Sequence, residues 1–145
     1  MNLKIDPQVV SNRLWALIAL YTFASLLHFV HNAEYIAFYP NMPAWITSAT
    51  VYKAWLCVAA VGVVGLGFWC MGWSVLGAVL VAAYGALGID GLAHYTLALC
   101  SEHSLAANAT IWFEVLSGAA LMLWAGARAY AGAKHWWALR GGLKV

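Results

Sequence analysis

The sequence predicts an all-α integral membrane protein, a bundle of four membrane-spanning helices forming a single domain over residues 1–145. Of its residues, 65% are hydrophobic and only 8% are charged, and the mean hydropathy is +0.80, outside the range of soluble domains. One span needs about 20 apolar residues, so a chain of this length holds four spans with short loops. The apolar runs are continuous and do not alternate, which excludes a lipid-facing β-barrel.

Four apolar runs give the expected spans, at about 14–38, 51–69, 75–99 and 105–124. The first should end at Pro40 and Pro43, because proline lacks the backbone N–H that a helix needs. Segments 70–74 and 100–104 are long enough only for tight turns between antiparallel helices. We therefore expect an up-and-down bundle.

Basic residues predict the orientation of the bundle, since cytoplasmic flanks of spans carry more Lys and Arg. Only Lys53 falls on one side, whereas six basic residues fall on the other: Lys4, Arg13, Arg128, Lys134, Arg140 and Lys144. Both termini are therefore predicted to be cytoplasmic. The expected location is the bacterial inner membrane or another cell membrane.

A weak internal repeat suggests that the bundle consists of two duplicated helical hairpins. Residues 21–31 (YTFASLLHFVH) align without gaps on residues 84–94 (YGALGIDGLAH), and 48–52 resemble 108–112. Such halves would be related by a pseudo-two-fold axis along the membrane normal. His31 and His94 would then occupy equivalent positions.

Ionisable residues within the predicted spans indicate a functional site. Each costs about 2.5 to 3.5 kcal/mol on insertion scales, so these side chains usually face the bundle interior. His28 and His31 are three residues apart and Asp90 and His94 are four apart, so each pair should share a helix face. Glu114 lies on the fourth span. All five fall in the predicted non-cytoplasmic half.

The first hypothesis is a metal site, because imidazoles and carboxylates converging from several helices are how bundles bind zinc and iron. His28, His31 and His94 would be ligands. Glu114 or Asp90 would be a fourth ligand, and the other carboxylate either a catalytic base or a hydrogen-bond acceptor for an imidazole N–H. Zinc is favoured over iron or copper. The chain would be a metal-dependent hydrolase or oxidoreductase acting on a lipid or another apolar substrate that reaches the site through the bilayer.

Three other interpretations stay open at this point. The cluster could be a structural polar network in a non-enzymatic membrane subunit, or His31 and His94 could be the axial ligands of haem b. A proton relay is disfavoured because the cytoplasmic half of each span is mostly apolar. Besides the bilayer, we expect an apolar small-molecule or lipid partner and no nucleic acid. Glycine-rich helices also suggest a homo-oligomer or a subunit of a larger membrane complex.

Overall fold

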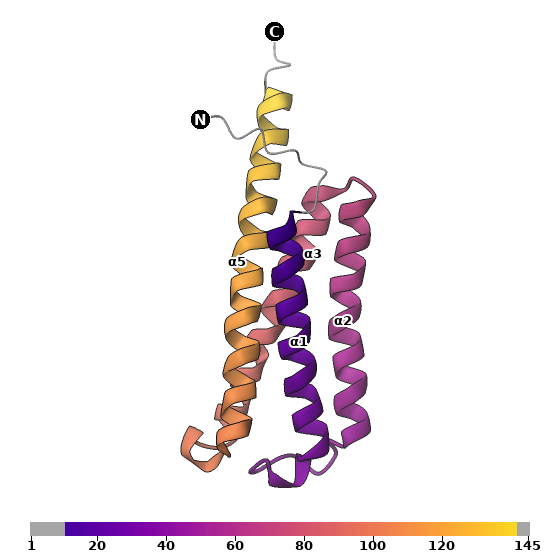
Figure 1. Ribbon diagram of the computed structural model, residues 1–145. Helices are drawn as coiled ribbons and strands as arrows, with labels where there is room; N and C mark the ends of the chain where they lie inside the picture. The colour runs from indigo at the N-terminus through magenta and orange to yellow at the C-terminus, as the bar shows by residue number, and fades with distance from the viewer. Residues whose placement is uncertain (1–10, 142–145) are drawn as a thin grey trace.

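A computed structural model describes residues 11–141, which are helical with no strand in that range (Figure 1). Four helical segments are long and apolar enough to cross a membrane, as predicted. The elements in chain order are α1 (Asn12–Glu34), η1 (Ile36–Phe38), α2 (Ser48–Cys70), α3 (Ser74–Leu87), η2 (Gly88–Ala93), α4 (His94–Leu97), η3 (Cys100–Glu102) and α5 (Leu105–Gly141).

Side-chain caps begin the first two spans slightly earlier than the hydropathy predicts. Ser11 accepts a hydrogen bond from the Leu14 amide ahead of α1. Thr47 and Thr50 form a reciprocal capping box at the start of α2. The first span also ends earlier than the predicted residue 38, because the chain tightens into a short 3-10 turn, η1, before Pro40.

The third predicted span, 75–99, is not one α-helix. It changes at Gly88 from α3 into the 3-10 segment η2 and resumes as the short α4 at His94. Glycine is a weak helix former, and here it also permits close packing, since a Cβ on Gly88 would lie 2.6 Å from the Tyr21 ring. The predicted duplication stays a prediction, although the continuous α1 has no counterpart to this change.

The last helix is much longer than the predicted 105–124 and runs on to Gly141. At about 1.5 Å per residue it measures roughly 55 Å, well beyond the hydrocarbon core of a bilayer. Figure 1 shows α5 projecting past the other helices at the end where α1 begins. We call this the basic end, because Arg13, Arg128, Lys134 and Arg140 lie there; Lys4 and Lys144 fall outside the described residues.

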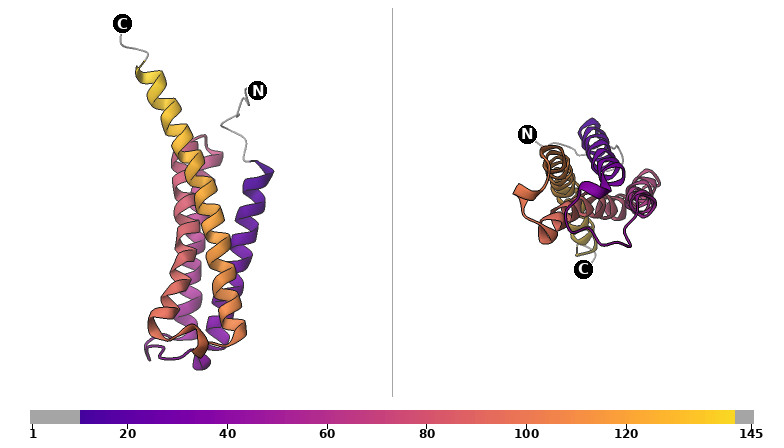
Figure 2. Two further views of the ribbon diagram at one scale, coloured as in Figure 1. Left: turned by 90° about the vertical axis from the view of Figure 1, so that its left-hand side faces the viewer. Right: turned by 90° about the horizontal axis from the view of Figure 1, so that it is seen from below.

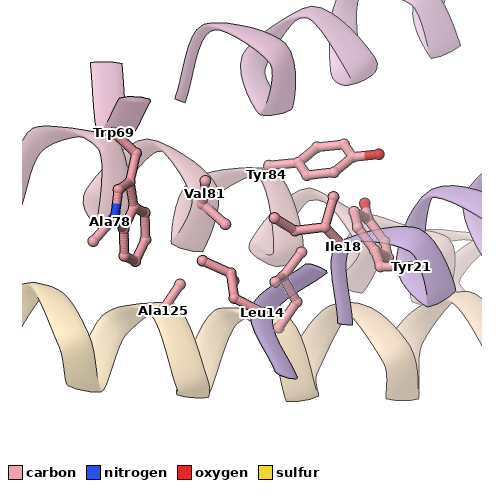
Figure 3. Packing of buried hydrophobic residues seen from close by; sticks show 9 residues of the cluster. Leu14, Ile18, Tyr21, Trp69, Ala78, Val81, Tyr84 and Ala125 are labelled. Atoms are coloured by element: carbon pink, nitrogen blue, oxygen red, sulfur yellow. The ribbon is translucent and has the colours of Figure 1, made fainter. Parts of the chain in front are cut away.

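Apolar packing closes the bundle near its basic end (Figure 3). The buried cluster draws on α1, α2, α3 and α5 and consists of Leu14, Ile18, Tyr21, Trp69, Ala78, Val81, Tyr84, Leu121 and Ala125. Apart from the two tyrosine hydroxyls and the Trp69 indole N–H, these side chains offer no polar atom. A polar path along the bundle axis would therefore stop here.

Helix α2 packs closely on α3 only toward the basic end. Its buried residues are Gly62, Gly65 and Trp69, and none of residues 48–61 is buried. A Cβ on Gly77 of α3 would lie 2.8 Å from the Gly65 carbonyl oxygen, so the two backbones nearly touch there. Figure 2 (right) shows α2 at the edge of the bundle, with α3 between it and α5. The other half of α2 therefore leaves space beside the bundle.

Candidate functional site

A pocket of about 510 Å³ lies beside the first half of α2. Its walls are apolar and include Phe29, Val51 and Val58. Its ionisable and amide side chains come from α1, η2, α4 and α5 and consist of His28, Asn32, Asp90, His94 and Glu114; two threonines, Thr50 and Thr96, also line it. A cavity of this size with a few convergent polar side chains is typical of a small-molecule site. The structure thus brings four of the five predicted site residues to one cavity.

Asn32 connects the two histidines of this pocket. Its amide nitrogen Nδ2 lies 3.0 Å from Nε2 of His28 and 3.1 Å from Nε2 of His94. An amide NH₂ carries two hydrogens, so it can donate one to each imidazole. His28 and Asn32 are one helical turn apart on α1, whereas His94 comes from the start of α4. The amide thereby holds α4 in place against α1.

Thr110 determines which nitrogen of His28 carries the proton. The Thr110 hydroxyl donates to the Ala107 carbonyl oxygen at 3.0 Å, so its oxygen can only accept from His28 Nδ1, 3.3 Å away. His28 therefore carries its hydrogen on Nδ1. In the neutral imidazole Nε2 is then the atom with the free lone pair, which agrees with its acceptance of the Asn32 hydrogen.

The same Nε2 of His28 lies 3.6 Å from Oε2 of Glu114, and both side chains are only 2% exposed. A neutral imidazole Nε2 and an ionised carboxylate would present lone pairs to each other. This repulsion is avoided when the pair carries one proton, either on Glu114 or on His28. At 3.6 Å the two atoms lie beyond hydrogen-bond distance, and the Asn32 amide is the hydrogen-bond donor to Nε2, so His28 and Glu114 are a close buried pair of acid and base side chains.

The 3-10 geometry of η2 changes how Asp90 and His94 relate. Residues in a 3-10 helix repeat every three positions, so Gly91 lies below His94, while Asp90 is turned away by about 120°. Asp90 is exposed and Gly91 is buried. A Cβ on Gly91 would lie 3.4 Å from Oε2 of Glu114, which makes this glycine the pocket wall beside the carboxylate. Asp90 and His94 are therefore not neighbours on one α-helix, although both line the pocket.

His31 belongs to a second group of side chains, which does not line the pocket. Its Nδ1 lies 2.7 Å from the Tyr39 hydroxyl, and the Tyr39 ring also contacts His94 and the buried His103. Burial raises the pKa of the Tyr39 phenol, so the hydroxyl stays protonated, and it pairs with His31 as donor or acceptor according to the imidazole tautomer. His31 and His94 both face Tyr39, which does not favour them as the two axial ligands of a haem.

Metal binding stays a prediction, and it would require a rearrangement. Two imidazole nitrogens do converge, but the Asn32 amide occupies the point where they meet. Among residues 11–141, no group of three or more His, Cys, Asp or Glu side chains is placed to hold a metal ion. Of the predicted ligands, His28, Asp90, His94 and Glu114 line the pocket, while His31 does not.

The sequence-based prediction gave no role in the site to three residues that organise it: Asn32, Tyr39 and Thr110. Asn32 could have been found, because it follows His28 by four residues on the same helix face. Thr110 likewise precedes Glu114 by one turn. Tyr39 gave no such signal, since it sits in a loop whose course depends on the prolines after it.

Comparison with protein-family models, with curated proteins and with solved structures finds no match for this chain.

Proposed function

We propose that this membrane protein binds an apolar small molecule or a lipid chain in the pocket and moves protons to and from it with His28 and Glu114. The observation that carries the proposal is the buried His28–Glu114 pair, 3.6 Å apart, at the wall of a largely apolar cavity. General acids and bases work best in such water-poor sites, where a proton is passed to the ligand and not to solvent.

The shape of the pocket supports a ligand that arrives from the bilayer. Val51, Ala54 and Val58 on α2 line it, and α2 contributes no buried residue over 48–61. Apolar walls favour a ligand without charges, because a charged group would lose its hydration there. Asn32 Oδ1 is buried without a hydrogen-bond partner among residues 11–141, so it can accept a hydroxyl or amine of the ligand.

The chemistry that this pair supports is proton removal and return. Once the Asn32 amide releases Nε2, neutral His28 uses that lone pair to take a proton from an acidified C–H of the ligand, and protonated Glu114 returns a proton to a second position. The two protons balance, and Glu114 recovers its own from His28 across the 3.6 Å that separates them. The net result is an isomerisation, or exchange of ligand hydrogen with solvent.

Deuterium incorporation tests this function without knowledge of the substrate. The protein would be placed in nanodiscs made from the total lipid extract of the cells that produce it, incubated in D₂O and extracted for mass spectrometry. We expect one class of apolar molecules to gain deuterium with the protein and not with empty nanodiscs. Identical isotope patterns in the two samples would contradict the proposal.

A metal-dependent hydrolase or oxidoreductase is the second candidate, favoured by the convergence of the His28 and His94 Nε2 atoms on one point. If the Asn32 amide turned aside, His28, His94 and Glu114 would supply the ligand types used by zinc, and next by iron or copper. Elemental analysis of untagged protein distinguishes the two. About one equivalent of metal that is lost in His94→Ala would favour the second candidate.

A further inference from the structure

A buried polar seam continues from the pocket toward the middle of the bundle. On α1 it consists of Tyr21, Ser25, His28 and Asn32, which are spaced by four, three and four residues and so share one helix face. Tyr21 and Ser25 are completely buried, and Tyr21 lies about 10 Å deeper than His28, at seven residues of helix. Buried polar side chains of α1 thus extend from the pocket toward the basic end of the bundle.

Helix α5 contributes a matching stripe opposite this face. Thr110, Glu114 and Ser117 are spaced by four and three residues, and all three are buried. The Ser117 hydroxyl donates to the Phe113 carbonyl of its own helix, so it is already paired. Glu114 is the group of this stripe that can accept or donate further hydrogen bonds toward α1.

Two hydroxyls of the seam have no hydrogen-bond partner among the residues from 11 to 141. These are Tyr21 OH and Ser25 Oγ, which lie one helical turn apart on the buried face of α1; the next turn on this face carries His28, whose Nε2 lies 3.6 Å from Glu114. By contrast, the neighbouring Tyr84 hydroxyl is paired with Thr22 at 3.0 Å. Buried polar groups are nearly always paired with protein or with an internal water, which needs two to four polar partners.

We propose that a water molecule is bound between the Tyr21 hydroxyl, the Ser25 hydroxyl and the Glu114 carboxyl. Three polar groups from α1 and α5 meet the usual requirement for an internal water. Tyr21 and Ser25 are then positioning residues, which hold Glu114 toward His28 through this water. The inference deepens the proposed function, since both use Glu114, yet the water site can be tested on the ligand-free protein.

The unfolding temperatures of two single variants and of the double variant test the water site. Tyr21→Phe and Ser25→Ala each remove a single hydroxyl. If the hydroxyls bind a shared water, each variant unfolds a few degrees below wild type, and the double variant falls by less than the sum of the two. Thr22→Val is the matched control: it removes the hydroxyl paired with Tyr84, and its effect should add to that of Ser25→Ala.

Infrared spectra supply a readout that packing alone would not change. Weakly hydrated films of wild type should show an O–H stretching band that moves in H₂¹⁸O and is lost in the double variant. Two results would overturn the water site: a higher unfolding temperature in either single variant, which is expected when an unpaired hydroxyl is removed, or the absence of an ¹⁸O-sensitive band. Neither result bears on deuterium transfer to the ligand, so failure here leaves the proposed function to its own test.

Discussion

Glu114→Gln is expected to lower deuterium transfer to the pocket ligand by about 10²- to 10⁴-fold, the usual contribution of a general acid or base. Glutamine keeps the shape of the side chain and can hydrogen-bond, but it cannot exchange a proton with His28 Nε2, 3.6 Å away. Because the substituted side chain stays polar and fills the same space, folding should be retained. Initial rates of deuterium uptake in nanodiscs give the comparison.

Glu34→Gln is the matched control for this variant. The same carboxylate-to-amide change at Glu34, the last residue of α1, lies outside the pocket. The exposed Glu34 carboxylate accepts a hydrogen bond from the Tyr52 hydroxyl at 2.6 Å. Deuterium transfer by Glu34→Gln should equal that of wild type. Full activity in Glu114→Gln would remove Glu114 from the reaction, and loss of the folded protein would make it a structural acid.

Gly85→Leu is expected to produce the largest loss of stability. Gly85 on α3 crosses Gly118 on α5, and a Cβ at Gly85 would lie 2.6 Å from the Gly118 carbonyl oxygen and 2.7 Å from the Met122 amide nitrogen. Backbone atoms cannot move aside as a flexible side chain can, so α3 must separate from α5. Overpacking of this kind costs about 1–3 kcal/mol or more, which thermal unfolding in detergent would show as a drop of several degrees.

The same substitution at Gly126 separates packing from helix propensity. Gly126 also lies on α5, but a Cβ there would meet no atom within 4 Å. Gly126→Leu should therefore unfold at or above the wild-type temperature, since leucine is the better helix former. Equal unfolding temperatures for Gly85→Leu and Gly126→Leu would contradict the close crossing of α3 and α5, and with it the placement of His94 opposite Glu114.

Hydropathy predicts the four spans well because each needs about 20 apolar residues, whatever its neighbours are. It does not predict where a span changes its helix type. The change occurs at Gly88, where the chain packs closely on Tyr21, 67 positions earlier, and it places Gly91 under His94. The end of α5 was missed for another reason: residues 125–141 continue as a helix beyond the apolar run.

The sequence predicts which ionisable residues form the candidate site better than it predicts how they are arranged. The high free energy of placing an ionisable side chain in a membrane correctly identified His28, His94 and Glu114 as interior residues, and all three line the pocket. This argument does not reveal which side chains are their hydrogen-bond partners. The Asn32 amide and the Thr110 hydroxyl fix the hydrogen-bonding roles of the imidazoles, and neither residue is charged. His31 was grouped with His28 by spacing, but its contact with Tyr39 arises from the loop after α1.

Photolabelling of the pocket tests the central claim most directly. Protein in vesicles would be irradiated with a diazirine-bearing fatty acid, and the adducts mapped by peptide mass spectrometry. We expect strong labelling of the pocket walls at Phe29, Val51 and Val58, and its loss in Gly91→Phe, whose Cβ would lie 3.4 Å from Oε2 of Glu114 and whose ring would crowd this wall of the pocket. Labelling confined to lipid-facing residues such as Val63 and Leu123, unchanged in Gly91→Phe, would contradict an apolar ligand held against the His28–Glu114 pair.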